Sequence, residues 1–387
     1  MSESNTHFKA FKYRLYPTPA QARQMLLVLN ICRNWYNMCV SERMWAYKLE
    51  GRGVKQAEQE KTAIQYRKTF AWAAQSVYSQ TLQTVCADVN KAYQAFFRRV
   101  KAGEKAGYPR FKGHNHFHSF AFKQFGSGAK LDGRRLELYG IGRVAVRWHR
   151  PIEGTIKTVR IIHKAGRWYA AFACEVEGKP ELPKTGRTVG IDVGISALVT
   201  TSAVDTVENH TFYRANQIRL RILQRKLARA HKGSKNRRKA LLRVQRQQEH
   251  VANQRRDYAH KLSHGLVKDF DLIALEDLRI RNMTRNRHLS KSILDSGWGI
   301  FRQFLTYKAV SAGREVIAVK PAYTSKCCSN CGIMFQNFDL STRWVDCGCG
   351  LSLDRDHNAA INILQRALVQ NGWDASVNDN VVPLPTP

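Results

Sequence analysis

The sequence predicts a multidomain α+β fold, and three observations support this prediction. The length of 387 residues suits two or three domains, at roughly 100–200 residues per domain. Residues 103–186 contain short segments in which apolar and polar side chains alternate, as in an antiparallel sheet. From residue 187 onward, strand-like and helix-like segments alternate, which is typical of an α/β domain.

The first strand of the sheet lies apart from the other strands in the sequence. Residues 8–16 alternate roughly between apolar and basic side chains, which indicates a strand. Thr18 and Pro19 suit the N-cap and the first position of a helix. Apolar residues at helical spacing then continue to about residue 101, with a break at 51–55. We therefore expect one antiparallel sheet or barrel, interrupted after its first strand by a helical insertion.

The second half begins with the segment TVGIDVGISALVTTS, which indicates two strands joined by a glycine turn. A long basic helical pair follows at 214–256 and breaks near Gly233. FDLIALEDL indicates an apolar strand that ends in acids, GIFRQFLTYKAVSAG a helix, and REVIAVKP another strand. The segment LDRDHNAAINIL opens a last helix, and the tail from Asn371 is expected to be disordered.

The charge of the chain limits its partners. Lys and Arg number 63 against 30 acidic residues, a formal net charge of +33, which calls for nucleic acid or an anionic membrane. The sequence has no apolar run of about 18 residues that would span a bilayer. Residues 1–18 lack the apolar core of a secretory signal. We therefore expect a cytoplasmic protein that binds nucleic acid and no membrane.

Five of the nine cysteines cluster near the C-terminus and suggest a metal site. Cys328 and Cys331 are two residues apart, and Cys347 and Cys349 follow with a single residue between them. Four thiolates suit tetrahedral zinc, and a full set of protein ligands makes the zinc structural rather than catalytic. Cys327 competes with Cys328 for the first ligand position. A reduced loop without metal is the alternative interpretation.

Three acidic residues lie where the sequence predicts burial. Asp192 stands in an apolar strand, Glu276 ends another strand, and Asp356 opens the last helix. A buried carboxylate is unfavourable unless it is paired or binds a metal. Carboxylate oxygens suit Mg²⁺, and two such ions about 4 Å apart activate a water and stabilise the leaving oxygen of a phosphodiester. The three acids are therefore the candidate catalytic site.

Each of these acids also has a simpler interpretation. Asp192 could be a turn residue, and Glu276 could be a solvated strand end that leaves Asp277 as the metal ligand. Asp356 could serve only to stabilise the last helix, through a favourable interaction with the positive N-terminal end of the helix dipole. Asp354 is expected to cap the helix rather than to bind metal. The acids are stronger candidates as a set, within a basic protein, than they are separately.

Two basic surfaces are candidates for binding nucleic acid. Between residues 214 and 256 there are 15 Lys and Arg residues and a single acid, Glu249, so the helical pair would repel itself without a polyanion. A solvated coiled coil is the alternative, although such helices usually mix both signs. The second surface surrounds GYPRFKG, where aromatic side chains could stack on bases or pack in the turn. The candidate contacts are Arg110, Lys112, Arg225, Arg229, Arg237 and Arg238.

Motifs along almost the whole chain resemble the TnpB family, which insertion sequences encode and which is related to type V CRISPR effectors. The chain shows, in order, YRLYPTPAQ, GYPRFKG, GIDVGI, LEDL, LDSGWGIFRQFLTYKA and YTSKCCSNCG, followed by CGCGLSLDRDHNAA. The resemblance implies a magnesium-dependent, RNA-guided DNA endonuclease. Such a protein binds a noncoding RNA from the transposon end, one protein per guide RNA, and reads a short motif beside its target DNA.

The resemblance also implies site residues. The catalytic, magnesium-binding triad of the family carries over to Asp192, Glu276 and Asp356. The zinc ligands carry over to Cys328, Cys331, Cys347 and Cys349, with a shortened second pair. Gln83 aligns with a helical residue that reads the target-adjacent motif, whereas its simpler interpretation is an exposed helix residue.

The resemblance implies two domains. The first is a wedge-like antiparallel β-barrel with a helical recognition insert. The second is a RuvC-like nuclease domain of RNase H fold, which a zinc-binding segment interrupts. The expected ranges are 1–18 and 103–186 for the wedge barrel and linker, 19–102 for the helical insert, 187–323 and 353–370 for the nuclease domain, 324–352 for the zinc-binding, nucleic-acid-loading segment, and 371–387 for the disordered tail.

Two other functions fit parts of the sequence. A guided DNA-binding repressor without cleavage activity would share the fold, but related repressors lose acids of the triad, and all three are present here. A transposase that joins DNA ends itself would also suit the RNase H fold.

Overall fold

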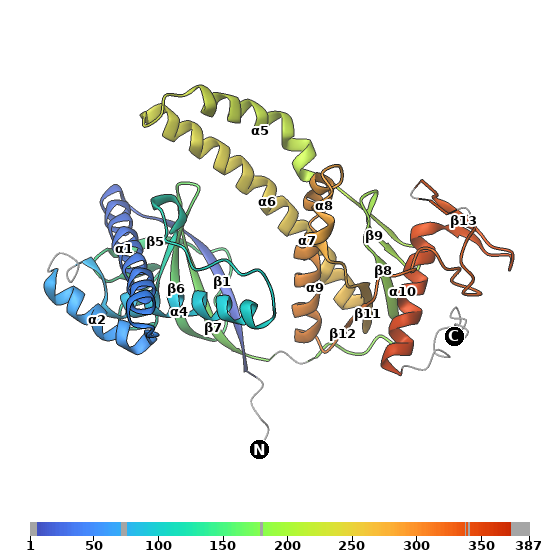
Figure 1. Cartoon of the computed structure of the whole chain (residues 1–387), viewed down its shortest axis with the longest axis horizontal. Coiled ribbons are helices and arrows are strands. Elements are labelled where there is room, and N and C mark those ends of the chain that lie inside the picture. The colour runs from blue at the N-terminus through green and yellow to red at the C-terminus, as the bar shows by residue number, and fades with distance from the viewer. Residues whose placement is uncertain (1–5, 71–75, 179–180, 337, 340, 373–387) are drawn as a thin grey trace, which may run out of the picture. The chain divides into compact units, whose positions relative to one another are not determined.

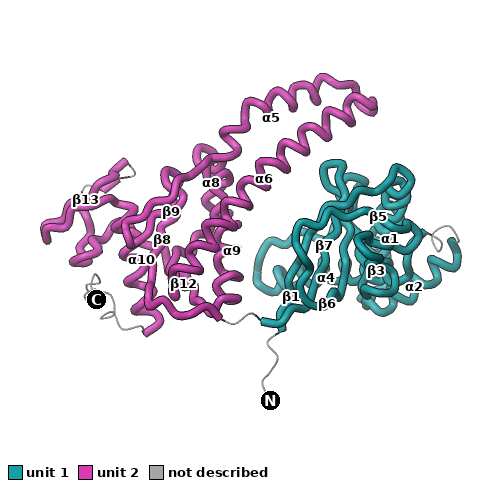
Figure 2. The backbone as a smooth tube through the Cα atoms, turned by 180° about the vertical axis from the view of Figure 1, so that it is seen from behind, with its two compact units in different colours: residues 1–178 teal, residues 179–387 magenta. Residues whose placement is uncertain are grey.

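The computed structural model describes residues 6–70, 76–178, 181–336, 338–339 and 341–372. The chain divides into two compact units, residues 1–178 and 179–387 (Figure 2). The predicted disordered tail lies outside the described residues from 373 onward. No described helix is long and apolar enough to cross a membrane.

The first unit is built on one antiparallel sheet with the strand order β2-β6-β7-β1-β5-β4-β3. The predicted antiparallel sheet is confirmed, and because its edges are β2 and β3 it is a curled half-barrel, the open form of the wedge-like barrel that the resemblance implies. The strands are β1 (Thr6–Tyr16), β2 (Ser119–Phe122), β3 (Ala129–Asp132), β4 (Arg135–Leu138), β5 (Gly142–Arg147), β6 (Thr155–Lys164) and β7 (Arg167–Glu177).

Strand β1 lies in the middle of this sheet. It pairs with β7 from Thr6 to Leu15 and with β5 at its end, so the first described strand of the unit is hydrogen-bonded to its last strand. The alternation seen in the sequence sets the faces, because Phe11 and Tyr13 are buried while Lys12 between them is exposed.

The described residues between β1 and β2 include the α-helices α1 (Pro19–Glu50), α2 (Gln56–Thr69) and α4 (Ser79–Lys101) and a short 3-10 helix, His114–His116. Thr18 caps α1 and forms a capping box with Gln21, and Gly51 ends the helix in the left-handed conformation. Trp35 of α1 and Leu82 of α4 are fully buried, in the same hydrophobic core as the sheet. The insertion is therefore part of the folded unit and not a separate module.

The second unit contains a five-stranded sheet with the order β10-β9-β8-β11-β12. Strands β8, β11 and β12 are parallel, whereas β9 and β10 run antiparallel to their neighbours. The strands are β8 (Thr188–Asp192), β9 (Ala197–Thr201), β10 (Thr206–Glu208), β11 (Leu272–Glu276) and β12 (Glu315–Val319).

Helices cover both faces of this sheet. Helix α10 (Arg355–Asn371) lies on one face, and α6 (Lys235–Asp269) and α9 (Trp298–Ser311) lie on the other (Figure 1). The remaining elements are α5 (Phe212–Arg229), the short helices α7 (Ile280–Met283) and α8 (Ser290–Ser296), and a hairpin of β13 (Trp344–Asp346) and β14 (Ser352–Asp354).

A buried ion pair holds the chain at the entry to β8. The side chains of Arg314 and Asp271 are 1% and 4% exposed, and an Arg314 nitrogen lies 2.5 Å from an Asp271 oxygen. Asp271 also accepts hydrogen bonds from the backbone of Thr185 and Gly186, both at 2.8 Å. Burial opposes the charge of Asp271, but these donors and Arg314 outweigh it and hold its pKa below the usual range.

Gly190 in the centre of β8 allows α10 to approach the sheet closely. A Cβ atom at this position would overlap the carbonyl oxygen of Ala360 and would lie 2.8 Å from Cβ of Leu364. Because Ala360 belongs to the middle of a buried helix, the backbone cannot retreat without moving the whole of α10.

We predict that Gly190→Ala destabilises the chain by about 3 kcal/mol, because the added methyl group overpacks the contact between strand and helix. Gly265→Ala is the matched control, since Gly265 lies within α6 and a Cβ atom added there would have no neighbouring atom within 4 Å. The control should be neutral or stabilising by up to about 1 kcal/mol. Thermal unfolding measures both, and similar midpoints for the two variants would contradict the packing argument.

Candidate active site and metal centre

Two parallel strands bring two carboxylates to the same edge of the second sheet. Strands β8 and β11 pair with Ile191 opposite Leu275, so Asp192 and Glu276 lie next to each other at the strand ends. Both side chains are partly buried. The carboxyl edge of parallel strands is the usual position of a functional site in α/β sheets.

Helix α10 brings the third carboxylate to this edge. Asp354 caps the helix, because its Oδ1 accepts the backbone N–H groups of Asp356 at 2.9 Å and His357 at 3.1 Å. Asp356 lies in the first turn, and its Oδ1 accepts hydrogen bonds from the guanidinium of Arg355 at 3.0 and 2.9 Å. The helix thus separates the two acids of the DRD motif into a cap and a member of the carboxylate cluster.

The three carboxylates interact electrostatically. Burial, followed by the charges of Glu276 and Asp356, raises the pKa of Asp192 to about 8. Burial also raises the pKa of Glu276, although a hydrogen bond from Thr324 opposes this effect. The cluster therefore resists full ionisation by itself, and a divalent cation would offset both the burial and the repulsion.

The carboxylate oxygens are less tightly gathered than the cysteine sulfurs described below. Asp192, Glu276 and Asp356 are not among the described sets whose ligand atoms all lie within 4.8 Å of one another. A bound ion would draw the side chains closer or complete its shell with water.

Asp277, the alternative to Glu276, has a different environment. Its side chain is 61% exposed and pairs with Arg302 at 2.6 Å. Glu276 is the strand-end acid that faces the charge of Asp192.

The four predicted cysteine ligands come together in the structure. The sulfur atoms of Cys328, Cys331, Cys347 and Cys349 all lie within 4.8 Å of one another. Cys328 lies 3.6 Å from Cys349, and Cys331 lies 3.5 Å from Cys347. A tetrahedral zinc–thiolate site has sulfur atoms about 3.8 Å apart, so the set fits a metal such as zinc. Cys327 is not a member of the set.

Hydrogen bonds to the thiol groups favour a metal-binding thiolate. The backbone N–H of Leu351 and the side chain of Asn330 lower the pKa of Cys349 to about 6, and hydrogen bonds with the thiols of Cys347 and Cys328 act in the same direction. Burial acts in the opposite direction on Cys328 and raises its pKa to about 12. A cation would lower the pKa of both thiols.

Buried amides of α10 fasten the cysteine segment to the helix that carries Asp356. Asn358 accepts the N–H of Ser329 and donates to the carbonyl of Cys327, both at 2.8 Å. Asn362 donates to the carbonyls of Thr324 and Cys327, also at 2.8 Å. Both asparagines are fully buried, so these bonds define how the segment sits on the helix.

Helices α5 and α6 form the predicted basic pair, which turns at Gly233. Arg225, Arg229 and Arg238 are exposed, as a contact with phosphate requires. Arg237 instead donates to the carbonyls of Leu227 and Ala230 at 2.9 and 3.0 Å and thereby caps the end of α5. The structure gives Arg237 a structural role, and its contact with nucleic acid stays a prediction.

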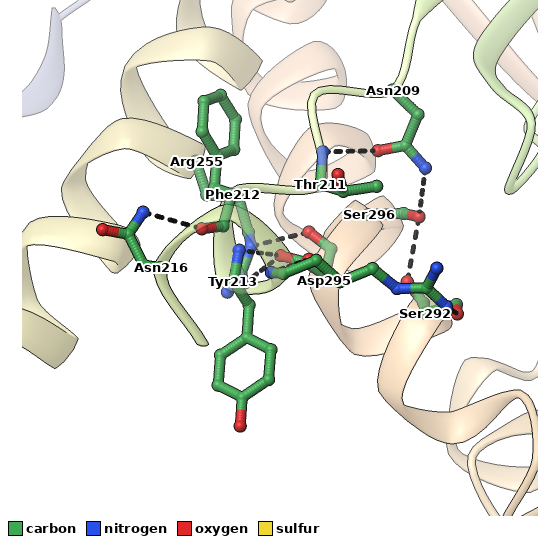
Figure 3. Close-up of polar contacts among 10 residues, drawn as sticks. Asn209, Thr211, Phe212, Tyr213, Asn216, Arg255, Ser292, Asp295 and Ser296 are labelled. Atoms are coloured by element: carbon green, nitrogen blue, oxygen red, sulfur yellow. Dashed lines mark hydrogen bonds and ion pairs between the residues drawn. The ribbon is translucent and has the colours of Figure 1, made fainter. Parts of the chain in front are cut away.

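The base of this helical pair is anchored by Asp295 of α8 (Figure 3). The Asp295 side chain is 1% exposed and accepts the N–H groups of Tyr213 and Arg214 at 2.7 and 3.1 Å, in the first turn of α5. It also pairs with Arg255 of α6 at 2.9 Å. One buried acid therefore holds both helices of the pair.

The remaining predicted contacts lie in the first unit. Arg110 is exposed, Lys112 is partly buried with its backbone held by Asn37, and Gln83 is partly buried on α4. Tyr108 packs edge-on against Tyr93 yet remains 42% exposed, so the structure leaves both packing and stacking open for it.

Two residues of the site were missed by the reasoning from the sequence. Thr324 contacts Glu276, and Asp295 anchors the basic helices. Thr324 lies in the motif YTSKCC and Asp295 in the motif LDSGW, both of which belong to the family resemblance. The two motifs therefore marked these residues, but the local sequence does not indicate which distant residues they contact.

Comparisons with known proteins identify the family. A family model described as "Probable transposase" matches residues 171–287, one described as "Cas12f1-like, TNB domain" matches 298–363, and one described as "Helix-turn-helix domain" matches 8–52. A Streptomyces pristinaespiralis protein named "Putative RNA-guided DNA endonuclease" is 33% identical over 365 residues, 93% of this chain and 89% of the relative. The chain belongs to the TnpB family.

A second TnpB-family relative and a solved structure agree with this placement. The Escherichia coli K12 protein "Putative RNA-guided DNA endonuclease InsQ" is 31% identical over 376 residues, 92% of this chain and 91% of the relative. The cryo-EM structure of a Cas12f1–sgRNA–target DNA complex matches with a TM-score of 0.59 at 14% identity, over 93% of this chain and 99% of the Cas12f1 chain. That match shows a shared fold.

The helix-turn-helix description does not fit the structure of this TnpB-family chain. Residues 8–52 form strand β1 and the single continuous helix α1, which ends at Gly51. Between residues 8 and 52, all of which are described, there is no second helix.

The carboxylate cluster predicts a dependence of stability on pH. The pKa of Asp192 is higher in the folded chain, about 8, than its ordinary value of 3.8. The folded state therefore keeps this proton to higher pH, and stability is lost as the pH rises between these values. With a chelator at pH 8, Asp192→Asn should be more stable than the wild type by on the order of 2–4 kcal/mol.

This difference should shrink as the pH falls toward 4 and should be measured by thermal unfolding in EDTA. Asp257→Asn is the control, because Asp257 is 65% exposed and pairs with Lys261 one turn away. A gain in stability that does not change with pH would contradict the electrostatic origin.

The cysteine geometry predicts the metal content of the purified protein. Elemental analysis should find one zinc ion per chain, because the four thiolates complete a tetrahedral shell. Cys331→Ser should lose most of this zinc and lower the thermal midpoint. Cys327→Ser is the matched control and should keep the zinc, and equal loss in both variants would show that the ligand set is different.

Proposed function

We propose that this chain is an RNA-guided DNA endonuclease that hydrolyses phosphodiester bonds with two Mg²⁺ ions. The observation that carries the proposal is the convergence of Asp192, Glu276 and Asp356 at one sheet edge of a TnpB-family protein. The relatives that share most of the chain bear the name of such endonucleases.

The catalytic residues act through position and charge. Asp192, Glu276 and Asp356 would hold the divalent ions through their carboxylate oxygens, which are the ligands that Mg²⁺ prefers. Bound at such a site, divalent cations lower the pKa of water and neutralise charge on the phosphate. The apolar strands around the cluster keep solvent from its rear face, and Arg355 orients Asp356.

The arrangement of the second unit supports a RuvC-like nuclease domain of RNase H fold. Residues 187–323 and 353–370 supply its sheet and last helix, and the zinc-binding segment 324–352 lies between them in the chain. The wedge domain consists of residues 1–18 and 103–186. Its helical recognition insert is residues 19–102. Zinc at the four cysteines is structural, since they leave no open coordination position.

Pairing with the guide RNA selects the target sequence, and the protein reads only the short motif beside it. The net charge of +33 requires a polyanion, and the exposed arginines of α5 and α6 are placed to contact its phosphates. One protein binds one guide RNA, and Gln83 with its neighbours on α4 reads the short motif beside the target.

A transposase is the second candidate, because the family model over residues 171–287 carries that description. A transposase would join transposon ends without a guide. A repressor without cleavage would bind the same RNA and DNA, but the intact carboxylate set favours catalysis.

The test is to express the chain with its native flanking DNA, sequence the bound RNA, and challenge the complex with a matching target and a randomised flank. Cleavage should require the guide and Mg²⁺. Glu276→Ala should lower the cleavage rate by about 10³-fold or more, since it removes a metal ligand. Asp277→Ala is the matched control and should stay within a few fold of the wild type, because Asp277 pairs with Arg302.

The alternatives give different results. Specific RNA with target binding but no cutting would identify a repressor. Joined products made from transposon ends without a guide would identify a transposase. Equal loss of activity in Glu276→Ala and Asp277→Ala would contradict the assignment of Glu276, rather than its neighbour, as the metal ligand.

A further inference from the structure

A buried threonine contacts one of the three carboxylates. Thr324 is 3% exposed, and its hydroxyl group lies 2.5 Å from Oε1 of Glu276. The carbonyl of Pro321 is the other acceptor within reach, at 3.2 Å. A hydroxyl group has a single hydrogen, and an ionised carboxylate at the shorter distance is the stronger acceptor. Thr324 therefore donates to Glu276 whenever that acid is ionised.

The backbone of Thr324 is fixed by the helix that carries Asp356. The Thr324 carbonyl accepts a hydrogen bond from Asn362 of α10 at 2.8 Å. The same amide holds the carbonyl of Cys327, one residue before the first cysteine of the metal set. Thr324 thus lies where three parts of the unit meet: the end of β11, helix α10 and the cysteine segment.

This placement restricts the side chain of Glu276. A glutamate at a strand end has three rotatable bonds and would otherwise sample several rotamers. The bond to Thr324 holds Oε1, and the other oxygen, Oε2, is left for a ligand. The hydroxyl group also opposes the rise in the pKa of Glu276 that burial produces.

We propose that Thr324 is a positioning residue that orients Glu276 for metal binding and links the cysteine segment to the carboxylate cluster. The inference rests on the proposed nuclease function, because it assigns Glu276 to a catalytic ion. It predicts that changes in the cysteine segment reach the cluster through Thr324 and its contact with Asn362.

The variant pair Thr324→Val and Thr324→Ser separates orientation from packing. Valine keeps the shape and removes the hydroxyl group, whereas serine keeps the hydroxyl group. Loss of a group that orients a metal ligand lowers metal affinity or activity by about 10–100-fold. We expect Thr324→Val to show this loss and a higher Mg²⁺ requirement, and Thr324→Ser to stay close to the wild type. Guide RNA binding should be unchanged in both variants.

Thr201→Val is the matched control for removing a buried hydroxyl group. Thr201 is also 3% exposed and ends β9, in the sheet that carries Asp192 and Glu276, but its hydroxyl accepts the backbone N–H of Asp205. This variant should lose stability without a change in the Mg²⁺ requirement.

A second readout does not depend on DNA cleavage. The guide RNA complex is loaded with Fe²⁺ in place of Mg²⁺ and treated with hydrogen peroxide and ascorbate. The bound Fe²⁺ reduces the peroxide to hydroxyl radicals, which cut the protein backbone near the ion, and ascorbate regenerates Fe²⁺. Fragments that end near residues 192, 276 and 356 should form in the wild type and in Thr324→Ser. They should be reduced at least tenfold in Thr324→Val.

The outcomes distinguish the two proposals. If the wild type neither cleaves guided targets nor gives the local fragments, the proposed function fails and Thr324 has no metal site to support. If the wild type does both and Thr324→Val matches it, the positioning role is overturned. If Thr324→Ser is as defective as Thr324→Val, packing rather than the hydroxyl group is responsible, which also overturns the role.

Discussion

The close packing of α10 against β8 at Gly190 is the constraint on which the second unit depends. The glycine lets the helix backbone approach the strand, and the apolar side chains Ile363 and Leu364 then close one face of the sheet. The same helix carries Asp356 at its start and fastens the cysteine segment through Asn358 and Asn362. One element thus sets the core, the carboxylate cluster and the metal-binding segment, so a shift of the helix would disturb all three.

The carboxylate cluster is unfavourable for the fold in isolation. Burial and mutual repulsion raise the pKa of Asp192 to about 8, which means that the apolar strands hold charges in an environment that disfavours them. Proteins retain such groups where function requires them, and the surrounding core supplies the stability. Here the cores on the two faces of the sheet fix the strand ends, while Thr324 and Arg355 fix the side chains. The rigidity that a metal site requires therefore comes from residues that do not touch the metal.

The sequence was sufficient for features that depend on local pattern. Alternation in β1, the capping residues Thr18 and Asp354, and the cysteine spacing each appear in the structure as the pattern indicates. Features that depend on contacts across the fold were not accessible. The open edges of the first sheet depend on which strands pair, and Arg237 turns inward because two carbonyls at the end of α5 need a donor. Thr324 and Asp295 have partners 48 and about 80 residues away in the chain, and no periodicity records such pairs.

The basic helices show how the chain manages its own charge. Asp295 is buried at the base of α5 and α6, where it neutralises Arg255 and caps α5, so this acid does not offset the charge of the outer part of the pair. Along that length Arg225, Arg229 and Arg238 remain exposed, and salt screens their mutual repulsion beyond the Debye length of about 8 Å at physiological salt. A bound polyanion reduces this repulsion most effectively in the folded arrangement, because the folded pair presents its charges along one surface. By mass action, a polyanion that binds the folded pair also stabilises it, most strongly at low salt. The anchor at Asp295 therefore does more than join two helices, since it holds the charged surface in the one geometry in which binding and folding support each other.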